Sequence, residues 1–293
     1  IRDRLESDHY PYTVTPTKMY DMIVVILPKK GLDVWIGRET VQNLRKYCNK
    51  LAIMQEGPHW YFHDYDINTQ FWFYTTLSSV DILFVHNQLD KRYYEGILGN
   101  KPIHVLPSLM IEDSVKDFTS EGRSGVMMGG NFCQWYGGFD SYIVSREYGG
   151  TIRCPSMGRK QSEEDSIPDI EYLQYLSWAG WIKELSKSRI GVHLMRTHAA
   201  GTFALNCAYL GIPCIGYAGL DTQELCHPDT TVSIADIPSA KRLMTQLSDP
   251  IEYANLSKKC RKLYDKNYQE ILANTIIDKL TNDNQKDTVN TLF

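Results

Sequence analysis

Short apolar runs alternate with helical patterns along the first 108 residues. Continuous runs of β-branched and other apolar residues are typical of buried parallel strands. The four runs of this kind are 21–28, 51–55, 81–86 and 102–108. Apolar residues recur at helical spacing in the segments between them, which are 39–50, 68–80 and 87–100. Asn68 or Thr69 is the predicted cap of the second helix.

A second series of strands and helices follows a polar segment, 109–124, which is the predicted linker. Its predicted strands are 125–130, 151–155, 190–195 and 213–217. Its predicted helices are 139–149, 181–188, 202–211, 221–226, 240–249 and 250–280. The polar residues 281–293 form the predicted tail.

Two blocks of strand–helix alternation predict an α/β protein with two Rossmann-like units, each built on a parallel sheet. The predicted units are 1–108 and 125–280, and the last helix is expected to pack back on the first unit. Because sheets of this class bind ligands beyond the carboxyl ends of their strands, we expect the site in a cleft between the units.

The net charge, the cysteines and the apolar runs limit which partners and which cellular compartment the sequence favours. The 293 residues carry a formal net charge of −4, so no global positive field favours nucleic acid or an anionic membrane. Seven cysteines are scattered without a CxxC pair, which predicts reduced, buried thiols and a cytoplasmic protein. No apolar run approaches the roughly 20 residues that cross a bilayer, and no secretory leader is expected.

The stretch from Met195 to Gly216, "MRTHAAGTFALNCAYLGIPCIG", joins a predicted strand to a helix through a polar loop. A helix N-terminus offers free backbone N–H groups and a partial positive charge, which suit a phosphate. Gly201 would let a ligand approach, Thr202 could cap the helix or bond a phosphate oxygen, and Arg196 would add charge. An ordinary strand–turn–helix junction explains the same pattern equally well.

The segment "GTFALNCAYLGIPCIG" resembles the donor-site segment of GT-B glycosyltransferases, especially the family-4-like group. The residues in register with the family pattern are Gly201, Leu205, Ala208, Gly211, Pro213 and Ile215. The resemblance implies a retaining, metal-independent hexosyl- or pentosyltransferase that uses a nucleotide sugar as co-substrate and no other cofactor.

Two family glutamates are replaced in this chain. In the family, the first Glu meets the transferred sugar and the second meets the ribose; His198 and Asn206 stand at those positions. Asn206 can donate to and accept from ribose hydroxyls, and His198 can bond a sugar hydroxyl or a phosphate as a candidate catalytic residue.

A second segment, 129–143, also aligns with the family pattern; its sequence is "GGNFCQWYGGFDSYI". In the family, this Gly-rich loop approaches the donor diphosphate, which implies donor-binding roles for Gly130 and Asn131. The family's basic residues are missing from the loop, so Arg196, Arg159 and Lys160 are the candidate positive charges. Turn chemistry alone also explains the glycines.

Two further sites are predicted. Asp221 is expected near the donor's sugar or ribose, or else as a helix cap. The loop "QEGPHWYFHDYD", 55–66, combines aromatic faces with polar groups that suit sugars, and His59 and Asp64 are its candidate general bases. A packed aromatic loop explains it equally well. A metal site is disfavoured because no helical period sets the ligand geometry.

Two alternatives to a glycosyltransferase stay open. One is a nucleotide-sugar epimerase of the same fold, which would be expected to place several carboxylates around the sugar. The other is a non-catalytic domain that binds a sugar, a nucleotide or a partner protein. The acceptor also stays open between a glycan, a small molecule and, with less support from the acidic balance, DNA.

Overall fold

The computed structural model describes residues 7–11, 14–27, 34–55, 57–118, 122–155, 160 and 162–268, without the side chains of 34–38 and Gln134. These residues divide into two compact units. Residues up to Leu106 belong to unit 1, and residues from Pro107 belong to unit 2. The predicted packing of the last helix and the predicted tail concern residues beyond 268, which lie outside the described residues.

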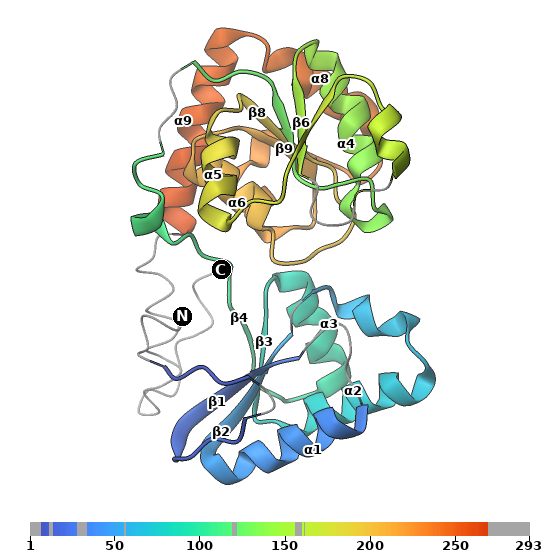
Figure 1. Cartoon of the computed structure of the whole chain (residues 1–293), viewed down its shortest axis with the longest axis vertical. Coiled ribbons are helices and arrows are strands. Elements are labelled where there is room, and N and C mark those ends of the chain that lie inside the picture. The colour runs from blue at the N-terminus through green and yellow to red at the C-terminus, as the bar shows by residue number, and fades with distance from the viewer. Residues whose placement is uncertain are drawn as a thin grey trace. The chain divides into compact units, whose positions relative to one another are not determined.

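Unit 1 is a parallel sheet whose four strands follow one another in sequence order. The strands are β1 (Tyr20–Ile26), β2 (Cys48–Met54), β3 (Ile82–Val85) and β4 (Ile103–Val105). The helices are α1 (Val34–Leu44), α2 (Ile67–Ser79) and α3 (Gln88–Leu98). Right-handed crossovers that all advance in one direction place their helices on the same face, as Figure 1 shows.

The core of unit 1 lies between that face of the sheet and the helices. Leu51 and Ile53 of β2 pack with Leu77 of α2 and Tyr94 of α3. Each of these side chains is buried. The apolar residues 51–54 of β2 and the fully apolar β3 therefore lie where sequence patterning predicts buried strands.

Unit 2 is a six-stranded parallel sheet with the order β10-β9-β8-β5-β6-β7. The strands are β5 (Val126–Met128), β6 (Ile152–Pro155), β7 (Ile170–Leu173), β8 (Ile190–His193), β9 (Cys214–Tyr217) and β10 (Thr231–Val232). The helices are α4 (Gly138–Ser145), α5 (Trp178–Ser186), α6 (Thr202–Tyr209), α7 (Asp221–Cys226), α8 (Ile237–Gln246) and α9 (Pro250–Asn267). Because the order reverses at β5 and β8, helices cover both faces (Figure 1).

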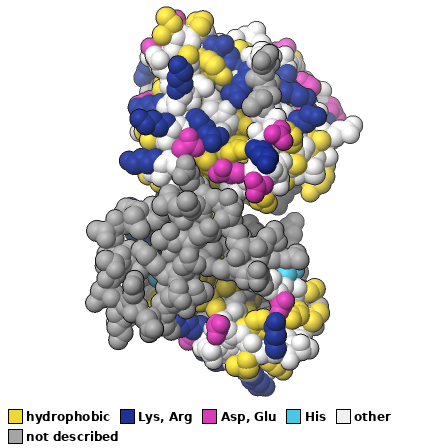
Figure 2. All heavy atoms as spheres, turned by 90° about the vertical axis from the view of Figure 1, so that its left-hand side faces the viewer, with side chains coloured by type: hydrophobic (Ala, Val, Ile, Leu, Met, Phe, Trp, Pro, Cys, Tyr) yellow, Lys and Arg dark blue, Asp and Glu magenta, His cyan; other side chains and the backbone are white. Residues whose placement is uncertain are grey.

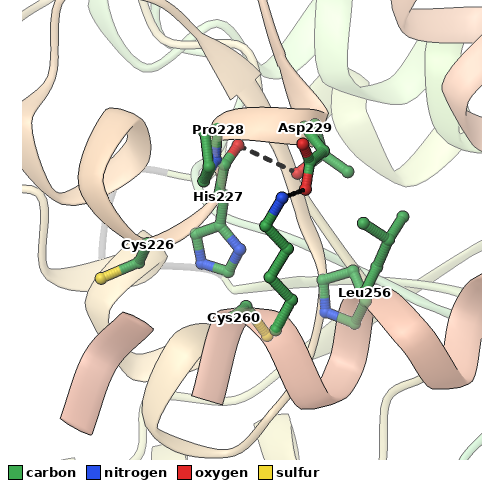
Figure 3. A pocket seen from close by; sticks show the side chains of 9 residues that line it. Cys226, His227, Pro228, Asp229, Leu256 and Cys260 are labelled. Carbon is green, nitrogen blue, oxygen red and sulfur yellow. Dashed lines mark hydrogen bonds and ion pairs between the residues drawn. The ribbon is translucent and has the colours of Figure 1, made fainter. Parts of the chain in front are cut away.

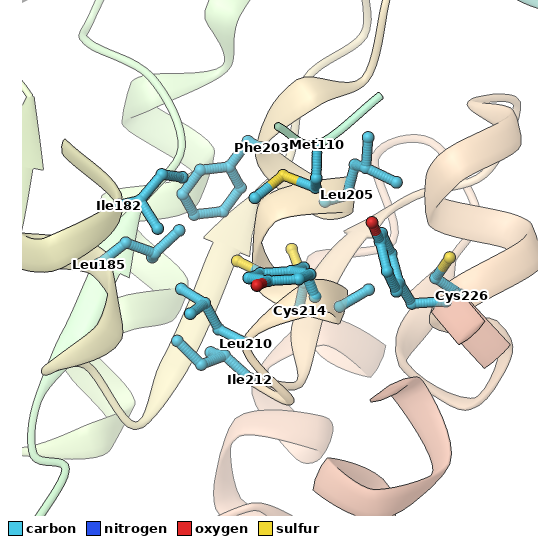
Figure 4. Packing of buried hydrophobic residues seen from close by; sticks show 14 of the residues in the cluster. Met110, Ile182, Leu185, Phe203, Leu205, Leu210, Ile212, Cys214 and Cys226 are labelled. Carbon is cyan, nitrogen blue, oxygen red and sulfur yellow. The ribbon is translucent and has the colours of Figure 1, made fainter. Parts of the chain in front are cut away.

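One face of the unit 2 sheet packs on α5, α6 and α9. Figure 4 shows Ile182 of α5 beside the Phe203 ring of α6, with Met110 lying between Phe203 and Leu205. The opposite face packs on α4 and α8 in a second buried cluster. The predicted linker also contributes to the first cluster, through the buried side chains of Met110 and Val115.

The predicted strands of both units are present, and the structure adds two that the sequence pattern missed. β7 is a four-residue edge strand that Glu171 interrupts, and β10 has two residues, so neither forms an apolar run. The prediction of a helix over 39–50 extends too far along the chain, because α1 ends at Leu44 and β2 begins at Cys48. Asp66, rather than Asn68 or Thr69, caps α2 by accepting a hydrogen bond from the Thr69 N–H group.

The predicted burial of the thiols is confirmed for six of the seven cysteines, and all seven are free. Cys133 is partly exposed. Burial raises the pKa of the Cys154 and Cys226 thiols to about 12, so these groups stay protonated. Among the described residues, every helix falls short of the combined length and apolarity that crossing a bilayer requires.

His227 ties three elements of unit 2 together. It accepts a hydrogen bond at Nδ1 from the Cys214 N–H group (3.3 Å) and donates from Nε2 to the Ala204 carbonyl (2.9 Å). His227 lines a cavity of about 10 Å³ together with Lys259 and Asp229, which form an ion pair. Figure 3 shows His227 and Asp229 among the residues around this cavity. That space is about one water molecule, so this pocket is a packing feature of unit 2 rather than a ligand site.

Burial lowers the pKa of His227 to about 4, although the bond to Ala204 opposes the shift. The unfolded chain therefore binds more protons between about pH 6.5 and 4, and stability should fall as pH drops through that window. His193, whose pKa burial also lowers to about 4, adds to the same loss.

We predict that His227→Gln flattens this pH dependence by on the order of 3 kcal/mol, as measured by urea unfolding across the window. His9→Gln changes an exposed histidine and should leave the dependence unaltered. Equal pH dependence in wild type and His227→Gln would contradict the burial argument.

Candidate functional site

The sheet of unit 2 reverses its strand order between β5 and β8, which pair with Met128 opposite Val192. The loops that leave these two strands head toward opposite faces, which opens a crevice at the carboxyl ends of the strands. The loop after β8 is held to α4, because the Leu194 N–H group donates to Ser141 Oγ at 3.0 Å. Ligands of open parallel sheets bind at this kind of point.

A cavity of about 310 Å³ lies beside this reversal, and we call it the unit 2 cavity. Residues of β5–β7, α5, α6 and the loop before α5 line it: Gly129, Pro155, Leu173, Gln174, Tyr175, Leu176, Trp178, Trp181, Thr202, Phe203 and Asn206. Its volume is at the lower end of the range, about 300–1,000 Å³, that is usual for small-molecule sites.

The wall of the unit 2 cavity is aromatic and uncharged. Trp178 and Trp181 of α5 face it together with Phe203 of α6, and Trp181 and Phe203 contact each other with centroids 6.2 Å apart. Tyr175, in the loop before α5, is 85% exposed. Aromatic faces of this kind suit the flat face of a base or the apolar face of a sugar ring.

Of the residues that line the cavity, Asn206 is the one with a buried side-chain amide. The residue is 5% exposed, but its amide is not one of the buried side-chain groups that lack a partner, so the amide faces open space on the cavity wall. A polar ligand can replace the water that binds to an amide in this position. Asn206 is therefore placed to bind a polar group inside the cavity.

Helix α6 begins at the cavity without a side-chain cap. Gly201 is the N-cap residue, with a φ of 65°, and Thr202 is the first helical residue. The first-turn N–H groups therefore have no capping oxygen, and they carry the positive end of the helix dipole. Gly201 is fixed by close packing, because a Cβ there would lie 2.1 Å from Thr222 Oγ1.

His198 and Arg196 lie outside the unit 2 cavity. His198 Nε2 lies 3.3 Å from the Ala218 carbonyl, and its ring packs against Gly219, where a Cβ would come within 2.4 Å of it. Arg196 is 58% exposed on its side chain and donates to Asp140 Oδ2 at 3.2 Å. The structure thus does not bring these two predicted residues to the wall that Asn206 forms.

Asp140 accepts hydrogen bonds from two side chains, those of Arg196 and Tyr217, at this edge of the sheet. The Tyr217 hydroxyl donates to the same Oδ2 at 2.9 Å. Burial raises the pKa of Tyr217 to about 12, and the bond to Asp140 adds to the rise. The charge of Arg196 is therefore partly compensated, and a phosphate would compete with Asp140 for it.

The Gly-rich loop after β5 is packed rather than open. A Cβ on Gly130 would lie 2.7 Å from the Cβ of Tyr136. Asn131 is buried, and its Oδ1 accepts a hydrogen bond from the Cys133 N–H group at 3.2 Å. Neither residue lines the unit 2 cavity, and both help to shape the turn that borders it.

The remaining predicted donor residues are dispersed. Arg159 lies outside the described residues. Lys160 forms an ion pair with Asp165, and its ammonium group sits 4.4 Å above the Tyr172 ring. The prediction that Asp221 caps its helix is wrong, because it is the first residue of α7 and Leu220 occupies the N-cap position.

The two candidate bases of unit 1 share a 3₁₀ helix, η2 (His59–Asp64). Asp64 is exposed and has no partner among the described residues. His59 lies against α3, where its Nδ1 is 2.8 Å from Asp90 Oδ1. In the described part of the chain, no three His, Cys, Asp or Glu side chains are grouped so that they could hold a metal ion.

Sequence reasoning found Thr202 and Asn206 but missed the aromatic wall opposite them. The signal was present as "QYLSWAGWI", 174–182, which carries Tyr175, Trp178 and Trp181. These residues follow β7, and because β7 was not predicted, nothing indicated that they come directly after a strand. Asp90 was missed because it lies 31 residues from His59 in the chain.

Neither a family model nor a curated protein matches this chain. Solved structures match it, among them the sucrose-phosphate synthase of Thermosynechococcus elongatus, with a TM-score of 0.69 and 13% identity over 89% of this chain and 73% of its own. HepE of Anabaena, in complex with UDP and glucose, matches with a TM-score of 0.69 and 9% identity over 89% and 77%. TarM matches with a TM-score of 0.66 and 8% identity over 89% and 54%.

At these identities the likeness shows the fold alone. It confirms the prediction of two Rossmann-like α/β units of the kind found in GT-B glycosyltransferases. The chain spans about half the length of TarM and about three quarters of the other two proteins.

We predict that Gly201→Ala destabilises unit 2 more than a matched glycine does. Gly149 also has a positive φ, 69°, but open space surrounds the position of its missing Cβ. Both variants bear the cost of a left-handed residue, about 1–2 kcal/mol, and the clash with Thr222 should add about 1–3 kcal/mol to Gly201→Ala. Urea unfolding measures both, and equal losses would show that the α6 start tolerates a side chain.

Proposed function

We propose that this protein is a glycosyltransferase that moves a sugar from a nucleotide-sugar donor to an acceptor hydroxyl without a metal ion. The observation that carries the proposal is the unit 2 cavity itself: an aromatic pocket that shares its wall with the uncapped N-terminus of α6 at the strand-order reversal. Such a site offers stacking for a base and N–H groups for a phosphate within one pocket.

The donor's nucleoside would occupy the aromatic part of the cavity. Trp178 and Trp181 supply apolar faces, and Asn206 supplies a donor and an acceptor for ribose hydroxyls. The HepE structure, which is in complex with UDP and glucose, supports this placement of a nucleotide and a sugar.

The donor's diphosphate would lie at the start of α6, near Gly201 and Thr202. The helix dipole favours anions there, and fixed N–H groups can stabilise the charge that grows as the nucleoside diphosphate leaves. Arg196 would add a full positive charge by exchanging its bond to Asp140 for one to the phosphate.

The acceptor is proposed to bind unit 1 near residues 59–64. Its class stays open between a glycan, a small molecule and DNA. On the face that Figure 2 shows, Lys and Arg side chains of unit 2 are spread with Asp and Glu side chains among them. The family resemblance implies that the anomeric configuration is retained, and this stays a prediction. Whether the transferred sugar is a hexose or a pentose stays open.

A second candidate is a domain that binds a nucleotide sugar without turning it over. The position of His198 favours it, because the ring is engaged by the Ala218 carbonyl and stands where the family has a carboxylate. Nucleotide binding without release of nucleoside diphosphate would identify this function. Conversion of the sugar without any acceptor would instead identify an epimerase.

The donor proposal predicts that a nucleoside diphosphate sugar from a panel of UDP-glucose, GDP-mannose and dTDP-glucose binds in the unit 2 cavity. Asn206→Ala should weaken that binding by about tenfold, the value of one hydrogen bond, in isothermal titration calorimetry. Asn255→Ala changes an exposed amide on α9 and serves as the matched control. Failure of the whole panel to bind the wild type would refute the donor proposal.

The placement of the phosphate predicts a selective effect of Arg196→Ala. Affinity for UDP, or for whichever diphosphate the panel selects, should fall by about tenfold, because a charged hydrogen bond is lost. Affinity for the corresponding nucleoside should not change, since it carries no phosphate. Equal loss for both ligands, or no loss for either, would remove Arg196 from the phosphate site.

A further inference from the structure

Helix α2 of unit 1 carries apolar side chains on its outer face as well as on the face that meets the core. The residues of α2 that are buried against the core are Thr69, Trp72, Phe73, Thr76 and Leu77. On the opposite side, Ile67 is 60% exposed, Phe71 is 62% exposed and Tyr74 is 43% exposed. Neighbouring apolar side chains that are exposed to this degree mark an interaction surface.

The exposed residues of the outer face follow the spacing of a coiled-coil seam. Successive members are four, three and four residues apart: Ile67, Phe71, Tyr74 and Ser78. Side chains at these intervals lie in one line along a helix, and this is the line that a second helix contacts. We call these four residues the α2 stripe.

The hydroxyl groups on and beside the α2 stripe already have partners within the helix. Ser78 Oγ donates to the Tyr74 carbonyl at 2.9 Å, and Thr75 Oγ1 donates to the Trp72 carbonyl at 3.0 Å. Burying a hydroxyl is costly when the group loses its hydrogen bonds, and these two keep theirs. An apolar partner can therefore cover them at little cost.

Helix α2 has no charged side chain along its 13 residues. Lys and Arg side chains attract anionic membranes, nucleic acids and acidic peptides, and α2 offers none of them. A second copy of the same helix fits this face, because no like charges meet when two uncharged stripes pack on each other.

Charges of opposite sign lie at the two ends of α2. Asp64 and Asp66 precede its first turn, and both are exposed. At the other end, Arg45 donates to the carbonyl of the last helical residue at 2.7 Å, and Lys101 donates to the carbonyl of the C-cap residue. Asp81 pairs with Arg45 and compensates one of these two cations, so this end stays positive.

We propose that the α2 stripe is the contact surface of a homodimer, in which two copies of α2 pack antiparallel about a two-fold axis. A two-fold contact brings the same patch of both copies together. In the antiparallel arrangement, the acidic start of each helix lies beside the basic end of the other, whereas a parallel arrangement would bring the acidic ends together. Ile67 then lies opposite Ser78 of the second copy, and Phe71 lies opposite Tyr74.

The size of the α2 stripe predicts a weak dimer. A helix of 13 residues is about 20 Å long. A contact confined to this length is smaller than a standard protein interface, which buries roughly 1,200–2,000 Å². The dissociation constant should therefore lie in the micromolar range, so that the dimer forms at high protein concentration and separates on dilution.

The first test measures the mass of the chain by sedimentation velocity at concentrations from about 1 μM to about 1 mM. The wild type should pass from monomer to dimer across this range. Phe71→Asp places a charge in the middle of the stripe and should weaken the dimer by at least about tenfold. Phe139→Asp, the matched control, changes a phenylalanine of α4 that is 65% exposed, and it should dimerise like the wild type.

Because Phe71 is exposed, Phe71→Asp should unfold at the same urea concentration as the wild type, and Tyr74→Asp is a second variant of the stripe if it does not. A wild type that stays monomeric at every concentration would overturn the proposal and would mean that another molecule covers the stripe. A Phe71→Asp chain that dimerises as tightly as the wild type would also overturn it. No substrate is needed, so the dimer and the proposed function are judged separately.

The second test measures the direction of the two helices. Ile67→Cys and Ser78→Cys are each made in a Cys133→Ala chain, because Cys133 is the one native thiol that is not buried. A short bismaleimide should cross-link a mixture of the two variants, since positions 67 and 78 face each other in the antiparallel pair. Neither variant should cross-link alone, because its two thiols are about 16 Å apart along the helix axis. Efficient cross-linking of either variant alone would overturn the antiparallel dimer.

Discussion

The reversal of strand order between β5 and β8 is the constraint on which the candidate donor site depends. A parallel sheet that winds in both directions from its centre leaves a crevice at the carboxyl ends of those strands. In this chain the crevice is bordered by α6, whose first turn is uncapped, and by α5, which turns two tryptophans inward. Close packing at Gly201 fixes where α6 begins, and therefore where its N–H groups point.

The chemistry of the unit 2 cavity follows from the neutral side chains of its wall. Asn206 stands where the family that the sequence resembles has a carboxylate, and the cavity wall carries no ionised side chain. In the proposed function, a wall of this kind leaves anion binding to the backbone of α6 and to Arg196. In unit 1, Asp90 orients the imidazole of His59.

Sequence patterning predicted eight of the ten observed strands, because short apolar runs between helical patterns are typical of parallel strands. The predicted burial of the first strand is wrong, since Val24 and Ile26 of β1 are exposed. It also located the start of α6, since a polar, glycine-containing loop before a small-residue helix is a local signal. It could not place Trp178 and Trp181, because the edge strand β7 before them is short and half polar. The pairing of His59 with Asp90, and that of Arg196 with Asp140, lay beyond reach because each joins residues far apart in the chain.

The central claim is that a nucleotide sugar binds at the start of α6 in unit 2. Backbone amide NMR of the chain labelled with nitrogen-15, recorded during titration with the nucleotide sugars, tests it most directly. The account predicts the largest shifts at the amides of Thr202 and Phe203 and at the indole N–H groups of Trp178 and Trp181. Shifts confined to other parts of the chain, or a spectrum that does not change, would contradict it.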